Sequence, residues 1–187
     1  MQVILSSFLL VAAAEMGDKT QLLAFTLASR FRRPWTVMAG ILAATLLNHL
    51  GAAAIGSWVS ARISPRWMEA ILAVMFLAFA IWMLVPDEAD EEREGKYGPF
   101  LTTAVLFFLA EMGDKTQLAT LALGARYHAT LLVTLGTTLG MLVADGLAVF
   151  LGDRLASRVQ SRWVRWVGAA LFLVFAVASA WAAWTGD

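Results

Sequence analysis

The sequence lacks cysteine altogether and contains only two histidines among its 187 residues. The absence of cysteine excludes disulfides, thiolate metal sites and cysteine nucleophiles. With so few histidines, a metal site would have to consist mostly of oxygen ligands, which favours Ca²⁺, Mn²⁺ or Mg²⁺ over structural zinc. The chain also lacks an excess of either charge, because 14 basic residues balance 14 acidic ones. Nothing in this balance points to a nucleic acid as a partner.

Hydrophobic residues, in contrast, are abundant. They make up 60% of the chain, and the mean hydropathy is +0.71. A run of about 20 apolar residues is long enough to span the hydrocarbon core of a bilayer. A soluble domain of this length would not contain so many such runs. The chain is therefore predicted to be an all-α membrane protein whose surroundings are the lipid bilayer.

Six apolar runs predict six transmembrane helices. Prolines and arginines separate several of the runs, and most of the eight tryptophans fall near their ends, where an interfacial aromatic belt is expected. The predicted spans are Val3–Ala28, Trp35–Ala61, Trp67–Val85, Phe100–Ala125, Ala129–Gly152 and Trp166–Trp184.

Nine residues, Ala-Glu-Met-Gly-Asp-Lys-Thr-Gln-Leu, occur twice without a change, at Ala14–Leu22 and at Ala110–Leu118. The two copies are 96 residues apart, and the same offset aligns the rest of the chain without a gap, for example Gly40 with Gly136. The chain is therefore predicted to consist of a three-helix repeat (1–86), an acidic linker (87–98) and a second three-helix repeat (99–187). Because three is an odd number, the second repeat must enter the membrane from the opposite side. Inverted repeats of this kind are typical of secondary transporters.

Basic residues orient the predicted helices, because cytoplasmic loops carry an excess of lysine and arginine. Nine basic residues fall on the side that holds the linker, and three fall on the other side. The linker is therefore predicted to be cytoplasmic and both termini to lie outside. A solvated linker is the favoured interpretation of this acidic segment, and a cation-sensing loop is the alternative. The nine are Arg30, Arg32, Arg33, Arg93, Lys96, Arg154, Arg158, Arg162 and Arg165, and the three are Arg62, Arg66 and Arg126.

The repeated nonapeptide places charges in the middle of two apolar stretches. Charged side chains at that depth are costly and usually face a protein interior or a water-filled path. On a helix, the two acids and the glutamine of each copy recur every three residues and share one stripe. If the two inverted helices cross at their midpoints, four carboxylates and two amide oxygens meet, a ligand set suited to a hard divalent cation. The predicted metal ligands are Glu15, Asp18, Gln21, Glu111, Asp114 and Gln117.

Two lysines accompany these acids. Lys19 and Lys115 follow Glu15 and Glu111 by four residues, which is the spacing of an intrahelical ion pair. Each motif then carries a net charge of −1 and the two together −2, so one divalent cation or two protons would neutralise the cluster. This charge favours exchange of a divalent cation for protons. The alternative is a static charged network, although an apolar interface would serve helix packing as well.

Two further pairs of motif residues have two interpretations each. Thr20 and Thr116 either supply hydroxyl ligands or bond back to the preceding turn. Gly17 and Gly113 either let the backbones approach closely or loosen the helix so that carbonyls turn toward the ion.

Three polar residues lie deep in the second and fifth predicted spans. Asn48 and His49 align with Ala144 and Asp145 when the offset is applied. A lone buried histidine is more often simply hydrogen-bonded than a ligand, but the counterpart of His49 is an intramembrane acid. Asn48, His49 and Asp145 are therefore predicted to support proton transfer or the polarity of the site.

The pattern Glu-x-Gly-Asp-(Lys/Arg)-(Thr/Ser), present twice at Glu15–Thr20 and Glu111–Thr116, resembles the Gdt-type cation/proton exchanger family. This family includes Golgi manganese and calcium transporters of eukaryotes and MneA-type manganese exporters of bacteria. The resemblance implies a cation:H⁺ antiporter in which the glutamates and aspartates of the two motifs bind the transported Mn²⁺ or Ca²⁺, with no permanently bound cofactor. The compact chain is similar to the bacterial members, which implies a plasma-membrane location.

Two other functions stay open alongside this antiporter. A passive divalent-cation channel would conduct without moving protons, and an intramembrane enzyme would use the Glu, Asp and Lys groups as acid and base. Identical residues in both halves favour a symmetric ion path over differentiated acid and base roles, so an enzyme is not expected. A homodimer is also left open.

The predicted orientation can be tested by labelling. Because the linker is predicted to be cytoplasmic, the cysteine of a Glu91→Cys variant should react only with reagents that reach the cytoplasmic side. A membrane-impermeant maleimide applied to intact cells and to inverted vesicles makes the measurement. Labelling from outside in intact cells would show that the topology is reversed.

Overall fold

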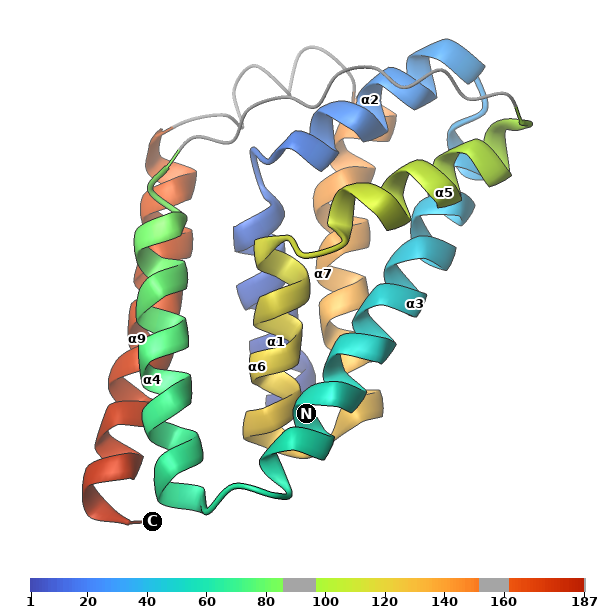
Figure 1. The fold of residues 1–187 in the computed structure, drawn as a ribbon. Coiled ribbons are helices and arrows are strands. Elements are labelled where there is room, and N and C mark those ends of the chain that lie inside the picture. Colours follow the sequence, from blue (N-terminus) through green and yellow to red (C-terminus); the bar gives the residue numbers. More distant parts are fainter. Residues whose placement is uncertain (86–96, 152–161, 187) are drawn as a thin grey trace.

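The computed structural model describes residues 1–85, 97–151 and 162–186. In these three ranges every regular element is an α-helix, which confirms the predicted all-α class. Most of the acidic linker and four of the counted basic residues, Arg93, Lys96, Arg154 and Arg158, lie outside the described residues. The helices are α1 (Gln2–Glu15), α2 (Lys19–Phe31), α3 (Pro34–Ser60), α4 (Pro65–Trp82), α5 (Pro99–Glu111), α6 (Lys115–Tyr127), α7 (Thr130–Leu151) and α9 (Arg162–Thr185) (Figure 1).

Within the described residues, four helices are long and apolar enough to cross a membrane. They are Pro34–Ser60, Pro65–Trp82, Thr130–Leu151 and Trp166–Thr185, with mean hydropathies of 1.6, 1.4, 1.7 and 2.0. Large apolar side chains point outward from them; Val74 and Val177, for example, are 69% and 62% exposed. So much outward apolar surface suits a lipid environment and not water.

The first and fourth predicted spans are not single helices. Val3–Ala28 and Phe100–Ala125 were expected to be continuous, but α1 ends at Glu15 and α5 ends at Glu111, each inside the repeated motif. Gly17 and Gly113 adopt φ angles of +85° and +80°, a conformation that ends a helix and that glycine adopts without steric cost. The helix is interrupted at both glycines, whereas a turn of backbone carbonyls toward an ion stays a prediction.

The aspartate after each glycine begins the next helix. Asp18 is the N-cap of α2, and its carboxylate accepts a hydrogen bond of 2.7 Å from the backbone N–H of Lys19. Asp114 takes the same N-cap position before α6. The sequence Gly-Asp is therefore a helix stop followed by a helix start.

The helices follow one another in the same order in both halves. With the offset of 96 residues, α1 matches α5, α2 matches α6, α3 matches α7, and α4 matches α9. Packing obeys the same rule, because α1 lies against α7 as α5 lies against α3, and α2 lies against α7 as α6 lies against α3. The counterparts α4 and α9 pack on each other and run in opposite directions, beside the group formed by the other helices (Figure 1).

Glycines allow the helices of opposite repeats to cross closely. A Cβ atom added to Gly136 would lie 2.5 Å from the backbone oxygen of Ile4, and one added to Gly40 would lie 2.8 Å from that of Phe100. Gly40 and Gly136 are counterparts, and so are Ile4 and Phe100. The α1–α7 and α5–α3 crossings thus use the same contact twice.

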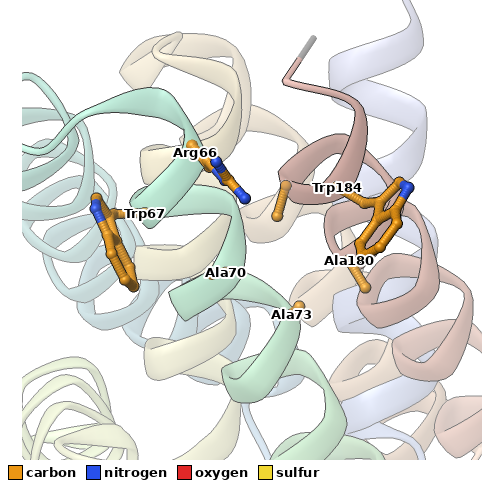
Figure 2. A pocket seen from close by; sticks show the side chains of 7 residues that line it. Arg66, Trp67, Ala70, Ala73, Ala180 and Trp184 are labelled. Atoms are coloured by element: carbon orange, nitrogen blue, oxygen red, sulfur yellow. The ribbon is translucent and has the colours of Figure 1, made fainter.

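A groove between α4 and α9 lies apart from the repeated motif. Its volume is about 560 Å³, and its lining comes from Arg66, Trp67, Ala70, Ala73, Ala180, Ala183 and Trp184. Figure 2 shows the Arg66 side chain reaching toward the space between the two helices, opposite Trp184. None of the predicted ligands lines this groove, so the ion site must be sought elsewhere.

The glycine crossing predicts the effect of a single methyl group. Gly136→Ala should lower the free energy of unfolding by about 1–3 kcal/mol, because the added Cβ meets backbone atoms that cannot move aside. Gly51→Ala is the matched control, since nothing lies within 4 Å of a Cβ at that position in α3. Thermal unfolding of both variants in detergent makes the comparison. Equal midpoints would show that the crossing does not require glycine.

Candidate cation site

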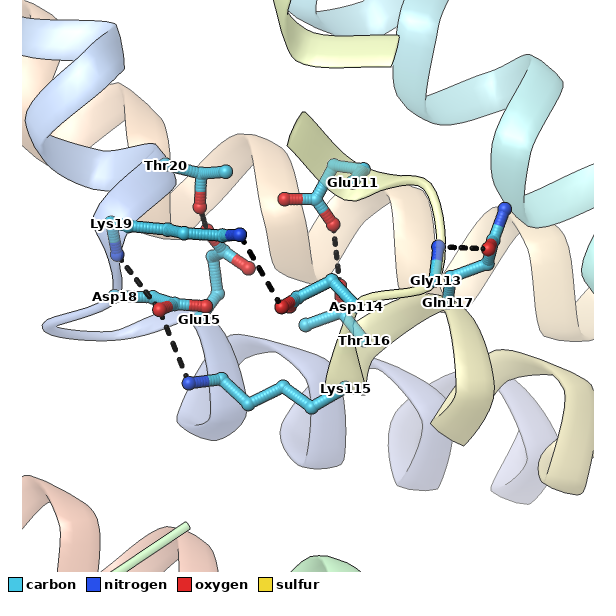
Figure 3. A network of polar contacts seen from close by, with 10 residues as sticks. All are labelled: Glu15, Asp18, Lys19, Thr20, Glu111, Gly113, Asp114, Lys115, Thr116 and Gln117. Atoms are coloured by element: carbon cyan, nitrogen blue, oxygen red, sulfur yellow. Dashed lines mark hydrogen bonds and ion pairs between the residues drawn. The ribbon is translucent and has the colours of Figure 1, made fainter. Parts of the chain in front are cut away.

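The two helix breaks direct acidic side chains into the interior of the protein, although Met112 in the second break is 56% exposed. Figure 3 shows the motif side chains of the α1–α2 break and of the α5–α6 break pointing toward one another. Glu15 and Glu111 are fully buried, and Asp18 and Asp114 are only 2% and 7% exposed. The fold thus brings four acidic side chains into one region, two from each repeat.

Each aspartate is paired with the lysine of the opposite repeat. The Nζ atom of Lys115 lies 3.1 Å from Oδ1 of Asp18, and the Nζ atom of Lys19 lies 3.9 Å from Oδ1 of Asp114 (Figure 3). The intrahelical pairing of each lysine with the glutamate four residues earlier was therefore a wrong expectation. Its physical basis is missing, because the glutamate ends one helix and the lysine begins the next.

Each glutamate is held by the threonine of its own motif. The hydroxyl of Thr20 donates a hydrogen bond to Oε1 of Glu15, and the hydroxyl of Thr116 donates one of 2.5 Å to Oε2 of Glu111. This bond crosses the break to a side chain and not to the backbone of the preceding turn, and the role of the hydroxyls as metal ligands stays a prediction. The second oxygen of each glutamate, Oε2 of Glu15 and Oε1 of Glu111, has no hydrogen-bond partner among the described residues. Buried oxygens of this kind require a ligand, a proton or water.

The two glutamines support the breaks. Oε1 of Gln21 accepts a hydrogen bond of 3.1 Å from the backbone N–H of Gly17, and Oε1 of Gln117 accepts one of 2.7 Å from that of Gly113. Their amide nitrogens reach the opposite repeat, where Gln21 donates to the backbone oxygen of Ala144 (2.8 Å). Gln117 donates to Oδ1 of Asn48 (3.4 Å). Each glutamine thus ties its break to the long helix of the other half, and its role as a metal ligand stays a prediction.

His49 and Asp145 occupy equivalent positions of the two repeats, on α3 and α7. Both are fully buried, and within the described ranges neither side chain has a hydrogen-bond partner. Asp145 is close enough to Glu15 and Glu111 to interact with both electrostatically. Its predicted role in proton transfer or in the polarity of the site stays a prediction. Asn48 donates to the backbone oxygen of Phe108 (3.1 Å) and so positions Gln117.

The carboxylates do not all converge on one point in this conformation. No three His, Asp or Glu side chains within the described residues are placed so that they could hold a metal ion together. The lysines lie against the aspartates instead. An ion-bound arrangement of the predicted ligands would therefore require these side chains to rearrange.

Buried acids, broken helices and paired repeats define a class of protein. Discontinuous helices that meet in the middle of an apolar fold, with ionisable groups at the breaks, are typical of ion-coupled membrane transporters. The chain belongs to the GDT1 family of divalent cation/proton antiporters. The sequence model of this family matches twice, over residues 3–91 and 99–187, and so covers each half separately.

Individual relatives agree with the family assignment. A protein of Vibrio cholerae serotype O1, provisionally named a manganese exporter, is 47% identical over 96% of this chain and 91% of its own length. A GDT1-like protein of Synechocystis is 31% identical over 94% of this chain and 95% of its own length. GDT1-like protein 3 of Arabidopsis thaliana is 31% identical over 93% of this chain and 69% of its own length. No solved structure is significantly similar to the chain.

The assignment decides between the functions that the sequence left open. A member of an antiporter family is a secondary transporter, so the protein is not an enzyme. The protein is an integral membrane protein that moves divalent cations against protons.

Proposed function

We propose that the chain crosses the membrane six times as two inverted three-helix repeats, residues 1–86 and 99–187, joined by the linker 87–98. In this arrangement α1 with α2 forms the first span and α5 with α6 the fourth, each interrupted near the middle of the bilayer. The opposite courses of the counterparts α4 and α9 support the inversion (Figure 1). Irregular backbone at membrane depth is tolerated where its polar groups have partners, as the N–H groups of Gly17 and Gly113 have in the side chains of Gln21 and Gln117.

The transported ion in this proposal is Mn²⁺, with Ca²⁺ as the second candidate. The provisional name of the Vibrio cholerae relative supports manganese, and the oxygen-only ligand set suits either ion. Glu15, Asp18, Glu111 and Asp114 bind it, with the amide oxygens of Gln21 and Gln117 as further ligands. The location proposed is a bacterial plasma membrane, with both termini outside and the linker in the cytoplasm. A homodimer stays open.

One observation carries the exchange mechanism. Two motifs, each with two acids and one lysine, form a single buried cluster whose net charge is −2 when all six groups are ionised. A buried charge of this size is costly unless it is compensated. One divalent cation or two protons compensate it equally well, so the cluster alternates between these two loads. A channel would not require such equivalence.

Proteoliposomes test the exchange and its selectivity. A pH-sensitive dye trapped inside should report proton movement when Mn²⁺ is added outside, a weaker response with Ca²⁺ and little with Mg²⁺, whose hydration shell is hard to remove. Ion flux that ignores an imposed pH gradient would instead identify a passive channel.

Neutralising one aspartate tests the site. Asp18→Asn removes a ligand and a proton acceptor together, so the rate of coupled exchange should fall by at least ~10-fold, while thermal stability in detergent stays measurable. Asp114→Asn should behave alike, because it is the counterpart. Glu69→Gln is the matched control, because Glu69 lies outside the motif, where its Oε2 atom is 2.9 Å from Nη1 of Arg126. This variant should exchange at a rate near that of the unmodified protein. An unchanged rate in Asp18→Asn would assign the motif a purely structural role.

A further inference from the structure

The two crossed ion pairs have a geometry that helix packing alone does not explain. Lys19 and Lys115 are the first residues of α2 and α6. The N-terminus of a helix carries a partial positive charge and disfavours a cation at that place. Each lysine therefore stands where its own helix repels it, and the carboxylate of the opposite repeat compensates this repulsion.

The two pairs are not equal. The Lys115–Asp18 pair is short, at 3.1 Å, and its side chains are 4% and 0% exposed. The Lys19–Asp114 pair is longer, at 3.9 Å, and its side chains are 21% and 6% exposed. Attraction between charges is weaker at longer distance and in a more polar environment. The Lys19–Asp114 pair is therefore the weaker of the two and the first to open.

We infer that Lys19 and Lys115 are built-in counter-cations of the transport site: their ammonium groups occupy the aspartates while no divalent cation is bound and leave them when the cation binds. This inference rests on the proposed function, in which Asp18 and Asp114 are ligands. Both lysines keep their charge throughout and act by changing place.

Competition of this kind has two consequences for transport. The lysines lower the affinity for the divalent cation, because it must displace them, and they speed its release, because they return to the aspartates. Each pair also joins the two repeats, so binding of the cation replaces two repeat-to-repeat ion pairs by one shared ion. Occupancy of the site is thereby connected to the contact between the halves.

Equilibrium binding of Mn²⁺ tests the inference, because free Mn²⁺ has an electron paramagnetic resonance signal that is lost on binding. Lys115→Gln and Lys19→Gln, purified in detergent, should each bind Mn²⁺ at least ~10-fold more tightly than the unmodified protein, since a competing positive charge is removed. Exchange in proteoliposomes should slow in the same variants, because release is no longer assisted. Lys115→Arg keeps the charge and should bind Mn²⁺ within about threefold of the unmodified affinity.

The sign of the change separates this role from a structural one. If the lysines only held the site together, Lys19→Gln would weaken binding of Mn²⁺ or leave it unchanged, and either result would overturn the inference. Arg126→Gln is the control, because it removes another ion pair between helices, Arg126–Glu69, outside the site. It should lower the unfolding temperature without changing the affinity for Mn²⁺. Should Lys115→Gln fail to fold, the more exposed Lys19 decides the question alone.

The same titration distinguishes failure of the inference from failure of the proposed function. If the aspartates are ligands, Asp18→Asn should lose binding of Mn²⁺ whether or not the lysines act as counter-cations. Loss of binding in Asp18→Asn together with unchanged binding in both lysine variants would reject the counter-cation role and keep the proposed site. Equal binding by Asp18→Asn and the unmodified protein would reject the site itself, and the inference with it.

Discussion

The structure depends on one constraint, which is that two apolar helical segments are interrupted, so the backbone groups freed at each break need partners within the protein. Three successive N–H groups at the first break have partners within the motif. Gly17 donates to the Gln21 side chain, Asp18 donates to the backbone oxygen of Glu15, and Lys19 donates to the Asp18 carboxylate. The motif is therefore first of all a device that makes a broken helix tolerable in an apolar fold. Its charged groups are then displayed from helix ends, where side chains can meet across the repeats.

Close packing of the two halves makes this meeting possible. Gly40 and Gly136 bring α3 and α7 against α5 and α1, and Gly56 and Gly124 do so between α3 and α6, where an added Cβ would lie 2.0 Å and 2.4 Å from backbone oxygens. Because the backbones of the two repeats approach so closely, the motif side chains are long enough to contact the opposite repeat. The ion pairs Lys115–Asp18 and Lys19–Asp114 are thus a product of helix packing as much as of local sequence.

The sequence predicted the class, the repeat and the identity of the buried acids, because composition, apolar run length and an exact nonapeptide repeat are visible in one chain. It did not predict the partners within the motif. Treating the motif as one continuous helix predicted an ion pair between Lys19 and Glu15. The Gly-Asp step, which marks a helix end followed by a helix start, was the signal in the sequence that the helix is not continuous. Pairing across the repeats was beyond the sequence in any case, since no local spacing records which side chains of two distant segments meet. Asp145 was found only through the offset of 96 residues.

The duplication is exact in the motif but not around it, and this difference bears on coupling. Asp145 interacts with both glutamates, whereas its counterpart His49 is a buried ring with no hydrogen-bond partner in the described part of the chain. With Asp145 included, the buried acids exceed the two lysines by three. A divalent cation bound to the symmetric motif then leaves one negative charge uncompensated, which is costly in a buried site. In the proposed exchange, a neutral loaded site therefore holds one proton in addition to the cation. Asp145 is the place for this proton, because it is the one buried acid of the described residues whose counterpart in the other half is not an acid. The same count gives the empty site three protons, so two protons still exchange for one divalent cation.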